Sequence, residues 1–212
     1  MSPGADELSL ADWRRRVAEL YADVRRIAAE DPAGAWERWR ATREALYRDH
    51  PQSPVQPDRR ATFAAHYFAY DPGLRFELPI QPPPAADLSA LAIALPNSGD
   101  DVLSFRRIGW IEVPFADRPR SLSLFWMAGY AGGLFLPFRD GTNGAETYGA
   151  GRYLLDGAKS ADLGGSMERR TLVIDFNFSF QPSCAFDPKW ACPLAPPENR
   201  LDLPIRAGER LS

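Results

Sequence analysis

Residues 102–138 read VLSFRRIGWIEVPFADRPRSLSLFWMAGYAGGLFLPF, and their rhythm indicates the class of fold. Short apolar runs alternate with breaks at glycine, proline and aspartate. Such breaks are typical of turns, and short runs between turns are typical of an antiparallel meander. The pattern predicts strands over 102–108, 110–115, 121–126 and 134–138, with turns at 116–119 and 131–133.

The same rhythm continues on both sides of this stretch. It predicts an extended piece at 64–70, a turn at 97–100 and strands over 74–78, 91–95, 148–155 and 172–178. Strands of this length and spacing favour a barrel-like or sandwich sheet. No repeat of fixed period is visible, which excludes a propeller or a solenoid.

Two amphipathic helices are predicted before the strands. Ser9 and Asp12 resemble a capping box, and apolar residues then recur at helical spacing as far as Ile27. The second helix begins at Asp31-Pro32 and ends before Pro51, because the residue before a proline disfavours helix. Its inner stripe consists of Trp36, Trp39, Leu46 and Tyr47.

The C-terminal residues 181–212 combine frequent proline with apolar side chains. A disordered tail would lack the apolar groups, so this segment is predicted to be an ordered, irregular strap. The whole chain is therefore predicted to be α+β: an N-terminal helical pair, then an antiparallel barrel-like or sandwich β-sheet with a proline-rich C-terminal strap. The predicted boundaries are a helical segment at 1–50 and a β domain at 51–212, forming one structural unit.

Composition excludes several classes of protein. The chain has 212 residues, 45% of them hydrophobic, and a net charge of −3, so neither disorder nor attraction to nucleic acid is expected. No run of 18 apolar residues is present, so no membrane span is predicted. The polar, acidic first residues do not resemble a secretory signal, and the expected location is cytoplasmic.

The familiar catalytic motifs are absent. The sequence has no phosphate-binding loop, no Gly-x-Ser-x-Gly and no His-Glu-x-x-His. The spacing of Cys184 and Cys192, considered with His50 and His66, does not match a zinc finger, so no metal is predicted and the cofactor is unknown. The cysteines are interpreted as packing residues or a local disulfide, with a catalytic pair of one cysteine and His66 as the alternative.

Polar residues gather in a glycine-rich hairpin over 138–154. One interpretation is a cross-strand charge ladder. The other is a ligand site in which Arg152 binds an anionic group while Thr142, Tyr148 and Tyr153 orient the ligand.

Two further polar clusters follow. In a regular strand Asp175 and Asn177 share one face, which is either a polar pocket or exposed to solvent. Glu198 and Asn199 follow two prolines, where they serve either binding or surface ion pairs and caps. The predicted ligand-binding residues are Arg139, Asp140, Thr142, Glu146, Tyr148, Arg152, Tyr153, Asp175, Asn177, Glu198 and Asn199.

Several of these segments resemble a known family. The segments are Tyr148-x-x-Gly-Arg-Tyr-Leu154, Asp175-Phe-Asn177, PSCAFDPKWACPLAPPENRL at 182–201 and PIRAGE at 204–209. Together with FRDGT at 138–142 and Tyr67-x-x-Tyr-Asp-Pro72, they resemble the bacterial and archaeal family called domain of unknown function 1684. The resemblance covers most of the chain after about Ala33. It implies a mostly β domain behind a helical region, and it implies no particular reaction.

The leading functional hypothesis is a small-molecule-binding β domain whose ligand is polar or anionic at one end, because arginine suits carboxylate and phosphate. One alternative is a hydrolase that uses the same pocket with a carboxylate base or a cysteine nucleophile. Another is a structural module that forms a homodimer through the aromatic helices. The residue pattern leaves open whether the protein is an enzyme.

Overall fold

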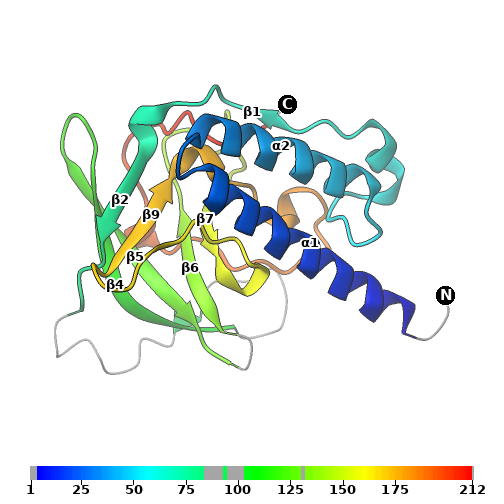
Figure 1. The fold of residues 1–212 in the computed structure, drawn as a ribbon, viewed down its shortest axis with the longest axis horizontal. Coiled ribbons are helices and arrows are strands. Elements are labelled where there is room, and N and C mark those ends of the chain that lie inside the picture. Colours follow the sequence, from blue (N-terminus) through cyan, green and yellow to red (C-terminus); the bar gives the residue numbers. More distant parts are fainter. Residues whose placement is uncertain (1–3, 84–92, 95–102, 130–131, 212) are drawn as a thin grey trace.

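We analysed a computed structural model that describes residues 4–83, 93–94, 103–129 and 132–211. An antiparallel helix pair, α1 (Ala5–Ile27) and α2 (Pro32–Asp49), precedes the strands (Figure 1). The predicted start of α2 is confirmed, since the Asp31 side chain accepts a hydrogen bond from Gly34 N at 2.9 Å. The predicted start of α1 is wrong by five residues, because the N-cap is Gly4 and not Ser9.

Three antiparallel sheets follow. β3 (Ile93–Ala94), β4 (Ser104–Pro114), β5 (Pro119–Met127), β6 (Gly133–Phe138) and β7 (Arg152–Asp156) form one sheet in that order. A second sheet has the order β2 (Arg75–Pro79), β9 (Thr171–Asp175), β8 (Gly165–Ser166), and a third pairs β1 (His66–Tyr67) with β10 (Glu209–Arg210). The α+β class is confirmed, and in the described residues the sheets do not close into a barrel.

Four predicted strands need correction. Residues 102–108 and 110–115 are not two strands, because β4 runs through Gly109 with a shift of register between Arg107 and Gly109. A Cβ at Gly109 would lie 2.4 Å from Gln81 O, so only glycine permits this approach. β7 begins at Arg152 and not at 148, and residues 176–178 form a 3-10 turn instead of the end of a strand. The predicted turn at 97–100 and most of the strand at 91–95 lie outside the described residues.

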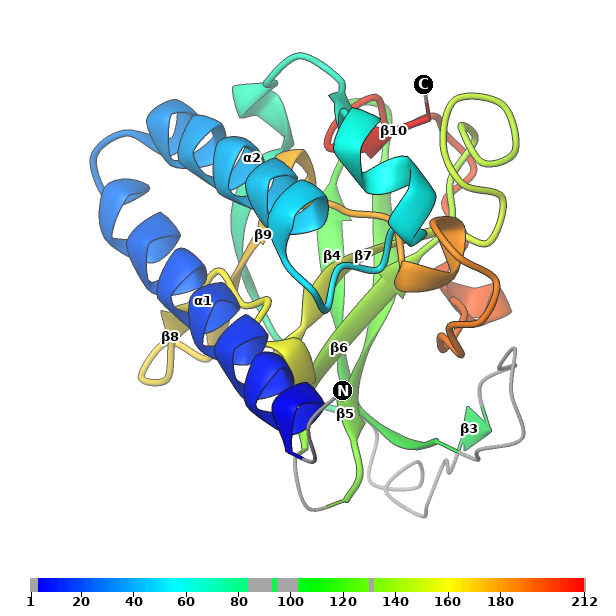
Figure 2. The same cartoon turned by 90° about the vertical axis from the view of Figure 1, so that its right-hand side faces the viewer.

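The interior consists of two main apolar clusters. One lies between the helix pair and the large sheet and includes Trp36, Trp39 and Phe125. The other joins the large sheet to β2 and β9 and includes Leu122, Ile174 and Phe176. Because the aromatic stripe of α2 is buried against the chain's own strands, the helix pair packs on the sheet (Figure 2).

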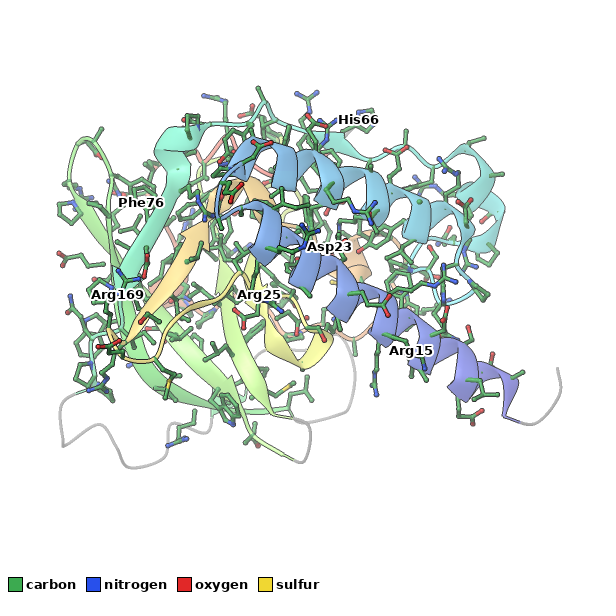
Figure 3. All side chains as sticks on the ribbon, in the orientation of Figure 1. Arg15, Asp23, Arg25, His66, Phe76 and Arg169 are labelled. Carbon is green, nitrogen blue, oxygen red and sulfur yellow. The ribbon has the colours of Figure 1, made fainter. Side chains whose placement is uncertain are left out.

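The outer face of the helices is charged. Arg15 and Asp23 lie along the exposed side of α1, while Arg25 reaches across to donate to Asp162 O at 2.7 Å (Figure 3). Of the helices in the described ranges, none has the length and apolar character needed to cross a bilayer. The C-terminal residues follow an irregular path with short 3-10 turns at Ser183–Ala185 and Pro197–Asn199, as the strap prediction requires.

Candidate functional site

Arg152 lies at the centre of the predicted site and is wholly buried. Its Nη2 donates to Asp140 Oδ2 at 2.6 Å and to Ile205 O at 2.8 Å. Its Nη1 donates to Ala207 O at 2.5 Å and to Glu209 O at 3.2 Å. One guanidinium therefore holds the strap residues 205–209 against β7. Burial lowers the pKa of Arg152, and the Asp140 carboxylate opposes that shift.

The hairpin residues around Asp140 bond mainly to one another. Asp140 Oδ1 accepts hydrogen bonds from the backbone N and the hydroxyl of Thr142, and the Thr142 hydroxyl lies 2.8 Å from that of Thr147. Arg139 and Glu146 lie further out: Arg139 donates to Gly149 O, and Glu146 pairs with the exposed Arg206 at 2.9 Å. The hydrogen bond from Arg206 lowers the pKa of Glu146.

Asp175 and Asn177 form a separate buried group. Asn177 donates to Asp175 Oδ1 and to Asp71 O, each at 2.8 Å, and its Oδ1 accepts from Asp71 N at 2.8 Å. Asp175 also pairs with Arg75 at 3.2 Å. The side chain of Asp175 caps the 3-10 turn through Asn177 N, which is why the strand ends there. Burial raises the pKa of Asp175, against the hydrogen bonds from Asn177 and the charge of Arg75.

Asn199 connects the strap to the large sheet. Its side chain accepts from Ser123 N at 2.7 Å and donates to Ser123 O at 2.9 Å and to Pro137 O at 2.7 Å. Its neighbour Glu198 is exposed and pairs with Arg107 at 2.5 Å. Tyr153 donates its hydroxyl to Pro193 O, which holds a further part of the strap.

The predicted residues thus divide into several clusters. Arg152 meets Asp140, which in turn bonds to Thr142, whereas Asp175 meets Asn177 and Arg75. Three surface hollows among the described residues are lined by no residue of the predicted set. The ligand-binding role of that set stays a prediction, and the contacts observed for it are contacts within the chain.

One of these hollows is a cleft between the helix pair and the start of the strap, with a volume of about 320 Å³. We call it the helix–strap cleft. Its walls are largely apolar and aromatic, and its polar residues come from segments that are far apart in the sequence. It is lined by residues of α1, α2, the loop after α2, and 158–192, among them Trp13, Val17, Tyr21, Arg43, Tyr47, Lys159, Phe180, Gln181, Trp190 and Cys192.

Arg43 is the charged residue in the wall of this cleft that is buried, with a side chain only 11% exposed. Its guanidinium lies over the rings of Tyr47 and Phe180, at 4.3 and 4.7 Å, and its Nη2 lies 3.0 Å from Glu209 Oε2. Burial favours the neutral form, but the Glu209 carboxylate acting together with Tyr47 and Tyr67 raises the pKa of Arg43. The cation is therefore permanent, and its position is set by two aromatic faces and one carboxylate.

Glu209 Oε1 of this ion pair and two polar atoms in the wall of the cleft lack hydrogen-bond partners within the described part of the chain. The two atoms in the wall are Arg43 Nε and Gln181 Oε1, and Gln181 is only 5% exposed. Buried polar atoms are usually satisfied, so orphaned ones in a cleft wall indicate where a ligand or a water binds. Gln181 is held through its backbone, since Gln181 N donates to Glu209 Oε2 at 2.7 Å.

Neither residue belongs to the predicted set. A signal for Arg43 was present, because it lies four residues after Trp39 and four before Tyr47, within the inner stripe of the second helix. A cation in an apolar stripe is a candidate functional group. For Gln181 no comparable signal exists, since its environment is created by the strap.

The architecture defines an α+β protein in which a helix pair and an irregular C-terminal strap enclose a cleft beside an open antiparallel sheet. Residues 62–210 match the family described as "Protein of unknown function (DUF1684)", and the chain belongs to that family. The predicted resemblance is confirmed, although the matched region begins after both helices and not near Ala33.

A solved structure of similar fold comes from Haloarcula marismortui. It is the solution NMR structure of an uncharacterized protein, 28% identical in sequence, with a TM-score of 0.56. The similarity covers 81% of this chain and 90% of that protein. Comparison with curated proteins gives no match.

Proposed function

We propose that this protein binds a small molecule in the helix–strap cleft. The observation that carries the proposal is the pairing of aromatic walls with two orphaned polar atoms, Arg43 Nε and Gln181 Oε1. Ligand sites combine apolar surface with a few fixed polar groups in this way. The volume of about 320 Å³ suits a molecule of one or two rings.

The polar atoms define the end of the ligand that they would recognise. Arg43 Nε offers a proton, whereas Gln181 Oε1 accepts one. A carboxamide or a protonated carboxylic acid supplies the complementary pair, and a carboxylate satisfies Arg43 alone. The exposed Arg14 and Lys159 at the cleft add positive charge, so an anionic or polar end is favoured.

The predicted Arg152 cluster supports this cleft from behind. Arg152 bonds to the backbone of Glu209, and Glu209 in turn positions both Arg43 and Gln181 N. The hairpin and strap residues 205–209 would therefore pre-organise the site without touching the ligand. Dimerisation through the aromatic helices has less support, because Trp36 and Trp39 are covered within the chain.

The test uses ¹⁵N-labelled protein with benzamide and benzoate as probes at millimolar concentration. The indole N–H signals of Trp13 and Trp190 should shift, since both rings line the cleft. Benzamide should bind more tightly than benzoate if Gln181 Oε1 takes part. Indole signals that stay in place with both probes would contradict the proposal.

A pair of variants makes the result specific. Ala191 is exposed and lines the cleft, so Ala191→Trp should fill its mouth and abolish the probe-induced shifts. Ala61 is equally exposed but lies outside the cleft, so Ala61→Trp should leave binding unchanged. Equal effects of both substitutions would show that the probes bind elsewhere.

A further inference from the structure

The two cysteines of the chain meet at the inner wall of the helix–strap cleft. Both are thiols, Cys192 is buried at 1% exposure and Cys184 is half-buried. Cys184 N donates to Cys192 Sγ at 3.3 Å, and each cysteine side chain has the largest influence on the pKa of the other. This contact places the backbone of Cys184 directly against the Cys192 sulfur.

The surroundings of the pair shift the pKa values of the two sulfurs in opposite directions. The hydrogen bond from Cys184 lowers the pKa of Cys192 to about 6, against the effect of burial, and Lys159 assists. The same hydrogen bond, together with burial, raises the pKa of Cys184, while Tyr148 opposes the shift. Tyr153 and the Lys159 partner Asp156 are the other titratable groups nearby. The surroundings of the pair thus favour a thiolate on Cys192 and a protonated thiol on Cys184.

In a reactive dithiol one sulfur is ionised at neutral pH and the other stays protonated. The two cysteines match that pattern. A packing role would require only burial. A structural disulfide would require no hydrogen bond that stabilises a thiolate. Cys192 also lines the cleft, so a very small oxidant reaches it while bulky reagents do not.

We propose that Cys184 and Cys192 are a redox-active dithiol that small hydroperoxides convert to an intramolecular disulfide. The Cys192 thiolate attacks one peroxide oxygen, the O–O bond breaks, and hydroxide leaves with Cys192 as sulfenic acid. The Cys184 sulfur then attacks Cys192 Sγ, the S–O bond breaks, and water carries away the thiol proton. Two electrons pass from the two sulfurs to the peroxide. The cleft serves only as the access path, so the small-molecule ligand proposed above is not required.

The reduced, full-length protein is treated with hydrogen peroxide, then denatured and alkylated with N-ethylmaleimide for intact-mass measurement. We expect loss of both alkylation sites together and a mass lower by two hydrogens, reversed by dithiothreitol. At pH 6 the rate should exceed that of free cysteine by roughly tenfold, because a larger thiolate fraction outweighs weaker intrinsic nucleophilicity. Native protein should react slowly with N-ethylmaleimide itself.

Variants assign the two roles. Cys184→Ser should stop at the sulfenic acid, detected as a dimedone adduct on residue 192, and Cys192→Ser should consume peroxide no faster than free cysteine. If a variant fails to fold, dimedone trapping and peptide mapping of the unaltered protein identify the attacking sulfur. Thiols that survive while free cysteine is consumed would overturn the proposal. So would a first adduct on Cys184, or a disulfide that dithiothreitol does not reduce.

Discussion

Arg152 and Arg43 are both arginines paired with a buried carboxylate, yet they occupy different environments. Arg152 makes four hydrogen bonds, three of them to carbonyls of the strap, and lines none of the three hollows. Arg43 lies 3.0 Å from Glu209, stacks on aromatic rings and lines the helix–strap cleft.

The difference separates two uses of a buried cation. An arginine whose donors are used by backbone carbonyls organises chain segments, because each bond fixes irregular backbone that has no ladder partner. Nε lacks a partner in both arginines, but only that of Arg43 belongs to a residue that lines the helix–strap cleft, where another molecule can reach it. Three measurements test or refine this distinction.

The largest effect is expected from Arg152→Met. It leaves the Asp140 carboxylate buried without its cation and removes the donors of three strap carbonyls. The free energy of unfolding, measured by urea denaturation, should fall by roughly 3–5 kcal/mol. Arg206→Met is the control, because its partner Glu146 is on the surface, and it should change stability little. Equal losses in both variants would show that Arg152 does not hold the strap.

Arg43→Met should have the next largest effect, about 3 kcal/mol, since it leaves Glu209 buried and unpaired. Adding Glu209→Gln should restore roughly 1–2 kcal/mol, because the remaining carboxamide oxygen still accepts from Gln181 N. Adding Asp140→Asn to Arg152→Met should restore less, since the strap carbonyls still lack donors. Equal recovery in the two double variants would remove the distinction between the arginines.

The smallest effect concerns the third buried pair, Arg75 and Asp175. Burial raises the pKa of Asp175 above its ordinary value of 3.8, so the folded protein binds this proton more tightly than the unfolded chain. The stabilising contribution is full below that value and is lost as pH rises through the folded pKa. The stability of the unaltered protein relative to Asp175→Asn should therefore fall between acid pH and neutrality, measured by urea denaturation. If the relative stability increased with pH instead, the ion pair with Arg75 would have a larger effect on the pKa of Asp175 than burial has.

Local signals predicted the elements that are decided locally. Asp31-Pro32 and His50-Pro51 bound α2 correctly, since a capping side chain and a steric clash act within a few residues. Residues 176–178 were predicted as strand because their apolar pattern continues, but the Asp175 side chain bonds to Asn177 N and turns the chain. The alternation of apolar and polar residues does not reveal a side-chain hydrogen bond that caps a turn and so ends a strand.

In the candidate site, too, some features are decided by neighbouring residues and others by distant segments. Within residues 138–154 Arg152 and Asp140 form a buried ion pair, and the ligand-binding role predicted for the group stays a prediction. Whether such a group faces a cavity or other backbone depends on the strap, which begins some 30 residues later in the chain. The cleft combines α1, α2 and residues 158–192, so no local pattern could assemble it.

Composition and periodicity were therefore sufficient for the α+β class, for the helix pair and for the ordered strap, because propensity, capping and burial patterns act between near neighbours. The environment of each arginine was settled by distant segments. Residues 205–209 supply the carbonyls that surround Arg152, and Glu209 and Phe180 surround Arg43. The sequence alone does not distinguish the roles of the two arginines, because each role depends on the acceptors that the folded chain brings close to the guanidinium.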